Sequence, residues 1–229
     1  MILDAQGLVD APVRDQGTIS IQPDVPSQAS VTRNAALLIV LLAALPANAQ
    51  RAERPAVAVG DRWDFAVYYT EPSRVPNRTW LITSVDKDRL HGTENGEPLT
   101  LSRDLNIVDA PRQSESNQRL LEFPLEVGKR WQYTSEWLFK PKGSRGTLAV
   151  EVTVAGYEPV DVPAGRFAAF RLLAVGELGG SAPSGTFFAG KTSTTLWYAP
   201  AARAIVKSIH FNPYQGTTTV ELTGFRLQH

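Results

Sequence analysis

The chain has 229 residues, 23 basic and 23 acidic side chains, and no cysteine. The even charge argues against a nucleic-acid-binding or polybasic membrane-surface protein. Without cysteine there can be no disulfide, no thiol catalysis, no thiolate metal site and no lipid anchor of the lipoprotein type.

Residues 1–30 contain four aspartates against the single basic residue Arg14, together with three prolines and no sustained hydrophobic periodicity. This composition is typical of a disordered segment. Bacterial genes can start on a valine codon, so translation from Val31 would leave residues 1–30 outside the protein altogether. The alternative is a genuine cytoplasmic extension.

Residues 31–49 have the three parts of a secretory signal peptide. These are one positive charge, an apolar run and small residues before a cleavage point: Arg33, residues 35–45, and Ala47 and Ala49 ahead of Gln50. The apolar run is shorter than the ~20 residues that span a bilayer. We therefore expect a cleaved signal and a periplasmic or secreted protein. If the signal is not cleaved, it would anchor the protein in the inner membrane.

Residues 50–229 form a single predicted domain in which apolar and other side chains alternate with a period of two. The clearest runs are 62–69, 130–139 and 148–154. Such alternation predicts strands with one buried face. Further strands are expected at 78–85, 99–102, 118–123, 166–173, 194–198, 205–210 and 217–227, with turns at 94–96, 142–144, 179–180 and 215–216.

This pattern predicts an all-β protein: a curved antiparallel sheet, either a half-barrel or a sandwich, preceded by the signal-peptide helix. Residues 59–65 (VGDRWDF) also match residues 127–133 (VGKRWQY), and Thr79 and Ile82 fall on Thr147 and Val150 at the same offset. We interpret the match as two tandem hairpin units, starting near 59 and 127, each opened by a glycine turn and each burying a tryptophan. The alternative is a chance similarity between two strands.

Four short motifs carry a family resemblance: VGKRWQY at 127–133, VPAGRF at 162–167, WYAP at 197–200 and IVK at 205–207. Over residues 59–227 the chain resembles exported bacterial domains of unknown function with these motifs. The resemblance implies a sheet curled into an open half-barrel, similar in outline to the lipoprotein-localisation factors. The family pattern W-Y-A-P-G-[VI]-G differs at 201–204, where this chain has Ala-Ala-Arg-Ala. The resemblance implies no catalytic residues.

No motif predicts a catalytic or metal site. His91 and His210 have no metal-ligand spacing, the serines of the loops at 142–146 and 180–185 do not fit a nucleophile motif, and Asp86 and Asp88 lie beside basic residues as in a solvated turn. We therefore expect no metal, no cofactor and no enzymatic activity. An enzyme would need a cleft that holds His91 or His210 within hydrogen-bond reach of a carboxylate or a serine.

Two functional hypotheses remain. The first is a non-enzymatic envelope protein that binds an apolar or amphipathic ligand, or an envelope protein partner. The second is a carbohydrate-binding or carbohydrate-acting module that uses exposed tryptophans as stacking platforms. The two hypotheses differ in the expected exposure of the tryptophan rings, because stacking platforms must reach solvent and core rings do not. The five candidate ligand-binding residues are Trp63, Trp80, Trp131, Trp137 and Trp197. The sequence does not indicate an oligomeric state.

The signal-peptide hypothesis predicts the N-terminus of the protein recovered from the envelope fraction. Because signal peptidase cuts after a small-x-small pattern, N-terminal sequencing should begin at Gln50. Recovery of an intact Met1 would contradict both the cleavage and the start at Val31.

Overall fold

The computed structural model describes residues 50–69 and 77–228. Residues 1–30, the predicted signal peptide at 31–49 and its Ala47 and Ala49 lie outside the described part, which begins at Gln50. The described part contains no α-helix, and no helix in it is long and apolar enough to cross a membrane.

The strands are short in the first half of the barrel and long in the second. In chain order they and one 3₁₀ turn are β1 (Arg51–Ala52), β2 (Arg62–Tyr69), β3 (Arg78–Val85), β4 (Arg89–Glu94), β5 (Glu97–Ser102), β6 (Ile107–Asp109), β7 (Gln113–Ser116), β8 (Leu125–Glu126), β9 (Arg130–Phe139), β10 (Ser144–Val162), β11 (Gly165–Ser181), β12 (Phe187–Ala199), η1 (Pro200–Ala202), β13 (Ala204–Asn212) and β14 (Gly216–Arg226).

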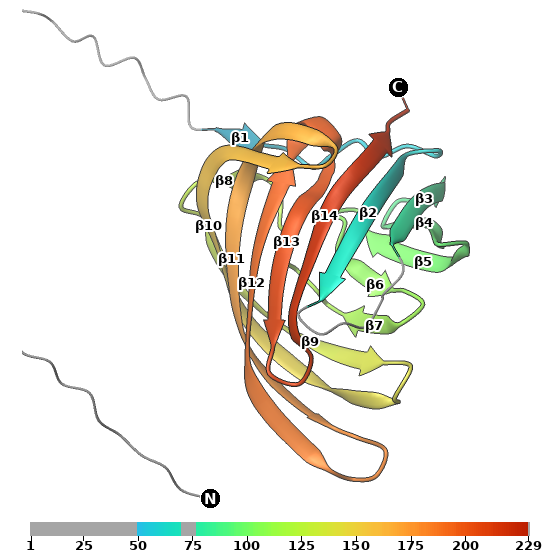
Figure 1. Cartoon of the computed structure of the whole chain (residues 1–229), viewed down its shortest axis with the longest axis vertical. Helices are drawn as coiled ribbons and strands as arrows, with labels where there is room; N and C mark the ends of the chain where they lie inside the picture. Colours follow the sequence, from blue (N-terminus) through green and yellow to red (C-terminus); the bar gives the residue numbers. More distant parts are fainter. Residues whose placement is uncertain (1–49, 70–76, 229) are drawn as a thin grey trace, which may run out of the picture. The chain divides into compact units, whose positions relative to one another are not determined.

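Twelve of these strands form one closed antiparallel barrel in the order β10-β11-β12-β13-β14-β2-β3-β4-β5-β6-β7-β9, and β9 pairs with β10 to complete the ring (Figure 1). β1 and β8 form a separate two-stranded sheet. The all-β antiparallel prediction is confirmed. The expected half-barrel or sandwich is not what forms, because the short hairpins β3 to β7 bridge the gap between β2 and β9.

Most predicted strands are present. The alternating runs 62–69 and 130–139 are β2 and β9 in full, and 148–154 lies inside β10. The segment 118–123 is a loop instead of a strand. The backbone groups of Leu121 in this loop are hydrogen bonded to a side chain instead of a strand: Asn106 Nδ2 donates to Leu121 O at 2.8 Å, and Leu121 N donates to Asn106 Oδ1 at 2.9 Å.

The predicted turn at 179–180 is also wrong, since both glycines lie within β11. Gly180 is needed there for packing. A Cβ at this position would lie 2.6 Å from Trp137 Cζ2 and 2.9 Å from Phe188 Cε2. A glycine inside a strand therefore marks a close approach of side chains here, not a change of direction.

The two glycine turns that precede β2 and β9 are built in the same way. Gly60 and Gly128 both have φ of +92°. Gly60 N donates to Ile82 O, and Gly128 N donates to Val154 O, each at 2.8 Å. The structural counterpart of Ile82 is thus Val154 and not Val150, so the equivalence of the turns does not continue along the strands at one fixed offset.

A buried carboxylate fastens one end of the barrel. Asp61 has 0% of its surface exposed and accepts hydrogen bonds from Ala58 N at 2.9 Å and from Gln228 N at 2.6 Å. The Arg203 guanidinium lies 3.5 Å from its Oδ2 and also donates to Ala56 O and Gln228 O. Arg203 adopts a left-handed φ of +50° after η1, at the position where this chain departs from the WYAP family pattern.

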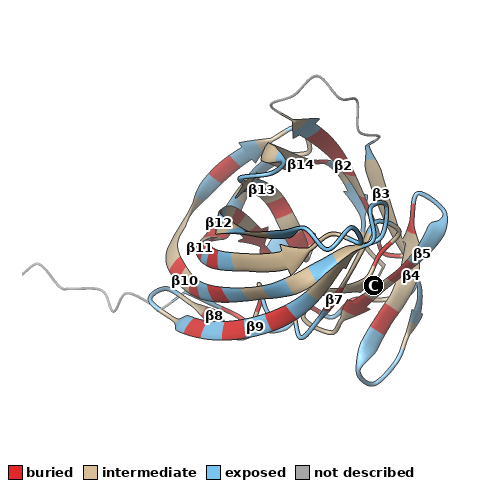
Figure 2. Cartoon of the chain, turned by 90° about the horizontal axis from the view of Figure 1, so that it is seen from below, coloured by how far each residue is buried: buried red, intermediate tan, exposed pale blue. Residues whose placement is uncertain are grey.

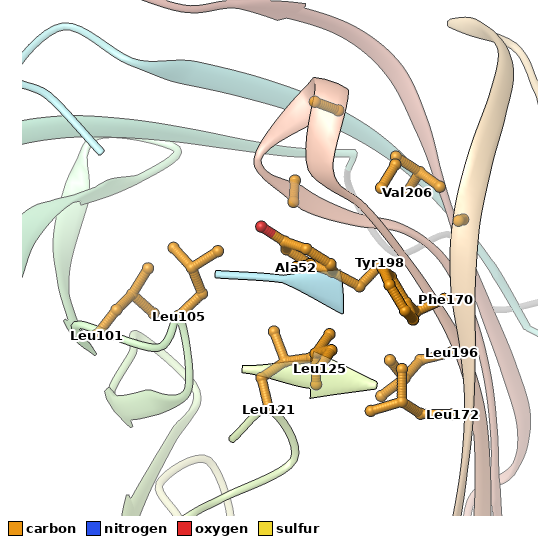
Figure 3. Close-up of a cluster of buried hydrophobic side chains, with 14 of the residues drawn as sticks. Ala52, Leu101, Leu105, Leu121, Leu125, Phe170, Leu172, Leu196, Tyr198 and Val206 are labelled. Atoms are coloured by element: carbon orange, nitrogen blue, oxygen red, sulfur yellow. The ribbon is translucent and has the colours of Figure 1, made fainter. Parts of the chain in front are cut away.

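The core is concentrated at this same end. Figure 3 shows the side chains of the small β1–β8 sheet, among them Ala52 and Leu125, lying among Leu172, Leu196 and Tyr198 of the barrel strands. Trp63 is 1% exposed and donates its indole N–H to Ala202 O at 2.8 Å. Seen from the other end, the strands alternate between buried and exposed residues along their length (Figure 2).

We expect Asp61→Ala to lower the free energy of unfolding by about 3 kcal/mol, because it leaves a guanidinium without its buried partner and two backbone donors without an acceptor. Urea unfolding measures the loss. Glu53→Ala is the control, since Glu53 makes only a solvent-exposed ion pair with Arg51 and should cost less than about 0.5 kcal/mol. Equal losses in the two variants would contradict the proposed role of Asp61.

Candidate functional site

A cavity of about 1310 Å³ occupies the interior of the barrel. Its lining reaches from Trp63, beside the core, to the turns at the opposite end, where Lys142, Ala182 and Tyr214 contribute. We call this second end the mouth. Lys142 and Tyr214 are exposed, so the cavity reaches solvent there. Its volume exceeds the ~300–1,000 Å³ of sites for drug-sized ligands, so there is room for a longer molecule.

One side of the cavity is apolar. We define the apolar wall by the inward-facing residues of β10 and β11 and one of β12 that line it: Leu148, Val150, Ala174, Gly176, Leu178 and Leu196. These residues follow the alternation of their strands, and none is charged. A Cβ on Gly176 would lie 2.8 Å from Thr192 Oγ1 and 3.0 Å from Leu148 Cδ1, so a larger residue at this point of the wall would displace these side chains.

A polar group from β7 and β9 flanks the apolar wall. Glu115 is buried and accepts hydrogen bonds from Ser135 Oγ at 2.6 Å and from Gln118 Nε2 at 2.7 Å. Burial raises the pKa of Glu115 above its usual range, although the two hydrogen bonds act in the opposite direction. Burial, and then the charge of Glu115, raise the pKa of the Tyr133 hydroxyl.

A second polar group lies on β12 and β13, on the other flank of the wall. His210 Nδ1 and Thr194 Oγ1 are 2.8 Å apart, and Thr192 and Ser208 line the cavity beside them. Burial lowers the pKa of His210, so the imidazole is neutral at pH 7. The cavity therefore has hydroxyl, imidazole and carboxyl groups on both sides of an apolar strip.

Three aromatic rings lie near the mouth. Trp137 and Phe188 have ring centroids 5.9 Å apart, and Phe188 packs edge-on against Tyr214 with centroids 5.3 Å apart. The Tyr214 hydroxyl donates to Ala189 O at 2.5 Å. The Trp137 indole N–H is buried and has no hydrogen-bond partner in the described part, a condition that typically costs about 1–3 kcal/mol.

Basic residues outnumber acidic ones along the described lining. Arg78, Arg112, Lys142 and Arg203 line the cavity, against Glu115 alone. Arg112 and Lys142 belong to neighbouring turns at the mouth, where Lys140 N donates to Arg112 O at 3.0 Å. The Arg112 guanidinium lies 5.8 Å from the centroid of the Phe139 ring.

Of the five predicted tryptophans, two are buried and three are half-buried. Trp63, Trp80 and Trp137 line the cavity, whereas Trp131 and Trp197 do not. Four of the five donate their indole N–H to a defined acceptor: Trp63 to Ala202 O, Trp80 to Glu94 Oε2, Trp131 to Arg119 O and Trp197 to Glu158 Oε1. These bonds hold the rings in place within the barrel wall, and the structure brings only three of the five to one site.

The histidines lie apart from one another. His91 Nε2 is 2.9 Å from Asp86 Oδ2 on the exposed hairpin β3–β4, outside the cavity lining. His210 lines the cavity, and its ring is hydrogen bonded to Thr194. In the described part, no three histidine or acidic side chains are placed to hold a metal ion.

Sequence reasoning missed the residues that give the cavity its polarity. Glu115 lies in Gln-Ser-Glu-Ser, a stretch with the composition of a surface strand, and Arg112 precedes it in a turn. Only the topology, which places β7 beside β9, turns Glu115 inward. No local pattern could have shown this.

Comparison with known proteins gives structural similarity only. No family model and no curated protein matches the chain. Among solved structures, a Bacteroides fragilis protein described as exported with a YmcC-like fold is 14% identical, covering 76% of this chain and 99% of that one, with a TM-score of 0.48. A Parabacteroides distasonis protein described as a lipoprotein is 10% identical, with the same coverage and a TM-score of 0.49. The hypothetical lipoprotein YmcC of Escherichia coli is 10% identical, covering 71% and 83%, with a TM-score of 0.44.

We expect the stability difference between the Glu115→Gln variant and the wild type to depend on pH. Because folding raises the Glu115 pKa, the folded state binds this proton more tightly, and wild-type stability falls as pH rises from about 4.3 through the raised value. The variant lacks this titration. Its free energy of unfolding relative to wild type should therefore be higher at about pH 7 than at about pH 4 in urea unfolding. A difference independent of pH would contradict a raised pKa.

Proposed function

We propose that the protein is an exported, non-enzymatic binding protein that holds an amphipathic ligand inside its barrel. The observation that carries this proposal is the cavity of about 1310 Å³, with an apolar wall between two polar groups and an opening at the mouth. Binding sites are commonly concave and mostly apolar, with a few placed polar groups. An extended apolar chain would bury its surface against Leu148, Leu178 and Leu196.

The export part of the proposal rests on residues 31–49, which have the composition of a signal peptide. We propose a periplasmic or secreted location after cleavage. Since the chain contains no cysteine, a lipid anchor of the lipoprotein type has no attachment point.

The contacts of the tryptophans favour this proposal over carbohydrate binding. A stacking platform must present a ring face to solvent, whereas Trp63 and Trp131 are buried and the other three tryptophans are half-buried. The non-enzymatic part is supported by the two histidines. His91 pairs with Asp86 outside the cavity lining, and the hydrogen-bond partner of the His210 ring in the described part is the hydroxyl of Thr194.

Ligand binding in the cavity can be tested by titrating the lipid-extracted protein with N-phenylnaphthylamine, a neutral probe that fluoresces in apolar surroundings. We expect the wild type to bind it, and Leu178→Trp to weaken binding about tenfold, because the indole would fill space along the apolar wall.

The matched control is Val175→Trp. Val175 lies on the same strand with 59% of its surface exposed on the outer face, so this variant should bind like the wild type. Native mass spectrometry of the unextracted protein should in addition show a co-purified lipid. If the wild type takes up no probe, or if the two variants have the same affinity for it, the proposal that a ligand binds inside the barrel is wrong.

A further inference from the structure

We infer that the ligand is a single-chain anionic amphiphile whose acidic headgroup lies at the mouth, beside Arg112 and Lys142, with its chain along the apolar wall. This inference rests on the proposed function and names the substrate class of the same site. The shared chemistry is an anionic oxygen group on a long hydrocarbon chain, and a carboxylate or a phosphate would each supply it.

The balance of charge on the lining is the first argument. Of the four basic residues, Arg203 is already committed to Asp61 and to two backbone carbonyls. Arg78 lies 4.0 Å from Glu94. Arg112 and Lys142 have no carboxylate within ion-pair distance among the described residues. The two cations of the described lining without a carboxylate partner are therefore both at the mouth, whereas the acidic residue Glu115 is buried and hydrogen bonded to neutral side chains.

Arg112 and Lys142 lie on two neighbouring turns at the edge of the cavity. The turn that carries Arg112 is hydrogen bonded to the turn that carries Lys142, because Lys140 N donates to Arg112 O at 3.0 Å. Within the second turn, Lys142 N donates to Phe139 O at 3.3 Å. Both side chains are exposed at the edge of the cavity. A cleft edged by one sign of charge attracts ligands of the opposite sign and orients them on entry.

The interior explains why the headgroup stays at the mouth. The buried acid Glu115, which pairs across the strands with Trp137, is already held by Ser135 and Gln118, and His210 is in contact with Thr194. No unpaired cation of the described lining lies at depth to receive an anion, and burying an unpaired anion is costly. The apolar wall, by contrast, begins near the mouth at Leu178 and continues to Leu196. The chain therefore enters and the head remains near water.

The test compares four amphiphiles with the same chain, each used below its micelle-forming concentration to displace N-phenylnaphthylamine from the protein. They are hexadecanoate, hexadecyl phosphate, hexadecanol and hexadecyltrimethylammonium. We expect the two anions to bind about fivefold more tightly than the alcohol, because two exposed charges contribute modestly each. The cation should bind more weakly than the alcohol. The advantage of the anions should shrink as salt rises from about 0.05 M to about 0.5 M.

The double variant Arg112→Gln/Lys142→Gln should lose this advantage while it binds hexadecanol as the wild type does. The matched control Arg145→Gln/Lys191→Gln removes the same charge from exposed residues of β10 and β12 outside the cavity lining, and it should keep the advantage. The relative affinity of hexadecanoate and hexadecyl phosphate identifies which anion the mouth favours.

The outcomes separate the two proposals. If none of the four amphiphiles binds, the proposed function is wrong and this inference falls with it. If all four bind with equal affinity, or if the mouth variant and its control lose the anionic preference equally, the barrel binds amphiphiles but the headgroup assignment is overturned.

Discussion

The pairing of β9 with β7 on one side and with β10 on the other turns a curved sheet into a ring, and the rest of the structure depends on this closure. In the described part, the ring gives each barrel strand a partner on both sides over at least part of its length, which reduces the free strand edge that another chain could pair with. It also fixes the width of the interior. About eight strands make a barrel that side chains can fill, whereas larger rings enclose space. With twelve strands, the cavity follows from the size of the ring, and the core fills only one end.

The long strands could be predicted from the sequence, and the closure could not. β9 and the centre of β10 alternate, and β2 does so apart from the buried Ala66, because one face of each contacts the interior. The segments that close the ring are short, and they contain residues that no strand pattern favours. Gly92 in β4 is one, since a Cβ there would lie 2.2 Å from Leu81 O. Conversely, residues 118–123 have the composition of a strand, but Asn106 takes both hydrogen-bonding groups of Leu121.

The candidate site was predictable only in outline. Large aromatic residues indicated a binding interior, and three of the five tryptophans do line the cavity. The polar residues of the site could not be predicted, because strand prediction assumes that inward-facing positions are apolar. That assumption fails where the interior is a cavity open to solvent. Thr192, Thr194 and Ser208 occupy inward positions where a packed core would have apolar side chains. From the sequence alone, such positions cannot be distinguished from a solvated face.

The contacts of Arg203 hold the two ends of the barrel chain close to each other. This one guanidinium binds the carbonyls of Ala56, shortly before the first barrel strand, and of Gln228, just after the last. Both chain ends of the barrel thus emerge together, and Figure 1 shows the C-terminus and β1 on the side away from the hairpin turns of the mouth. A fusion partner or a solid support coupled after Gln228 would leave the opening unobstructed and facing the bulk solution.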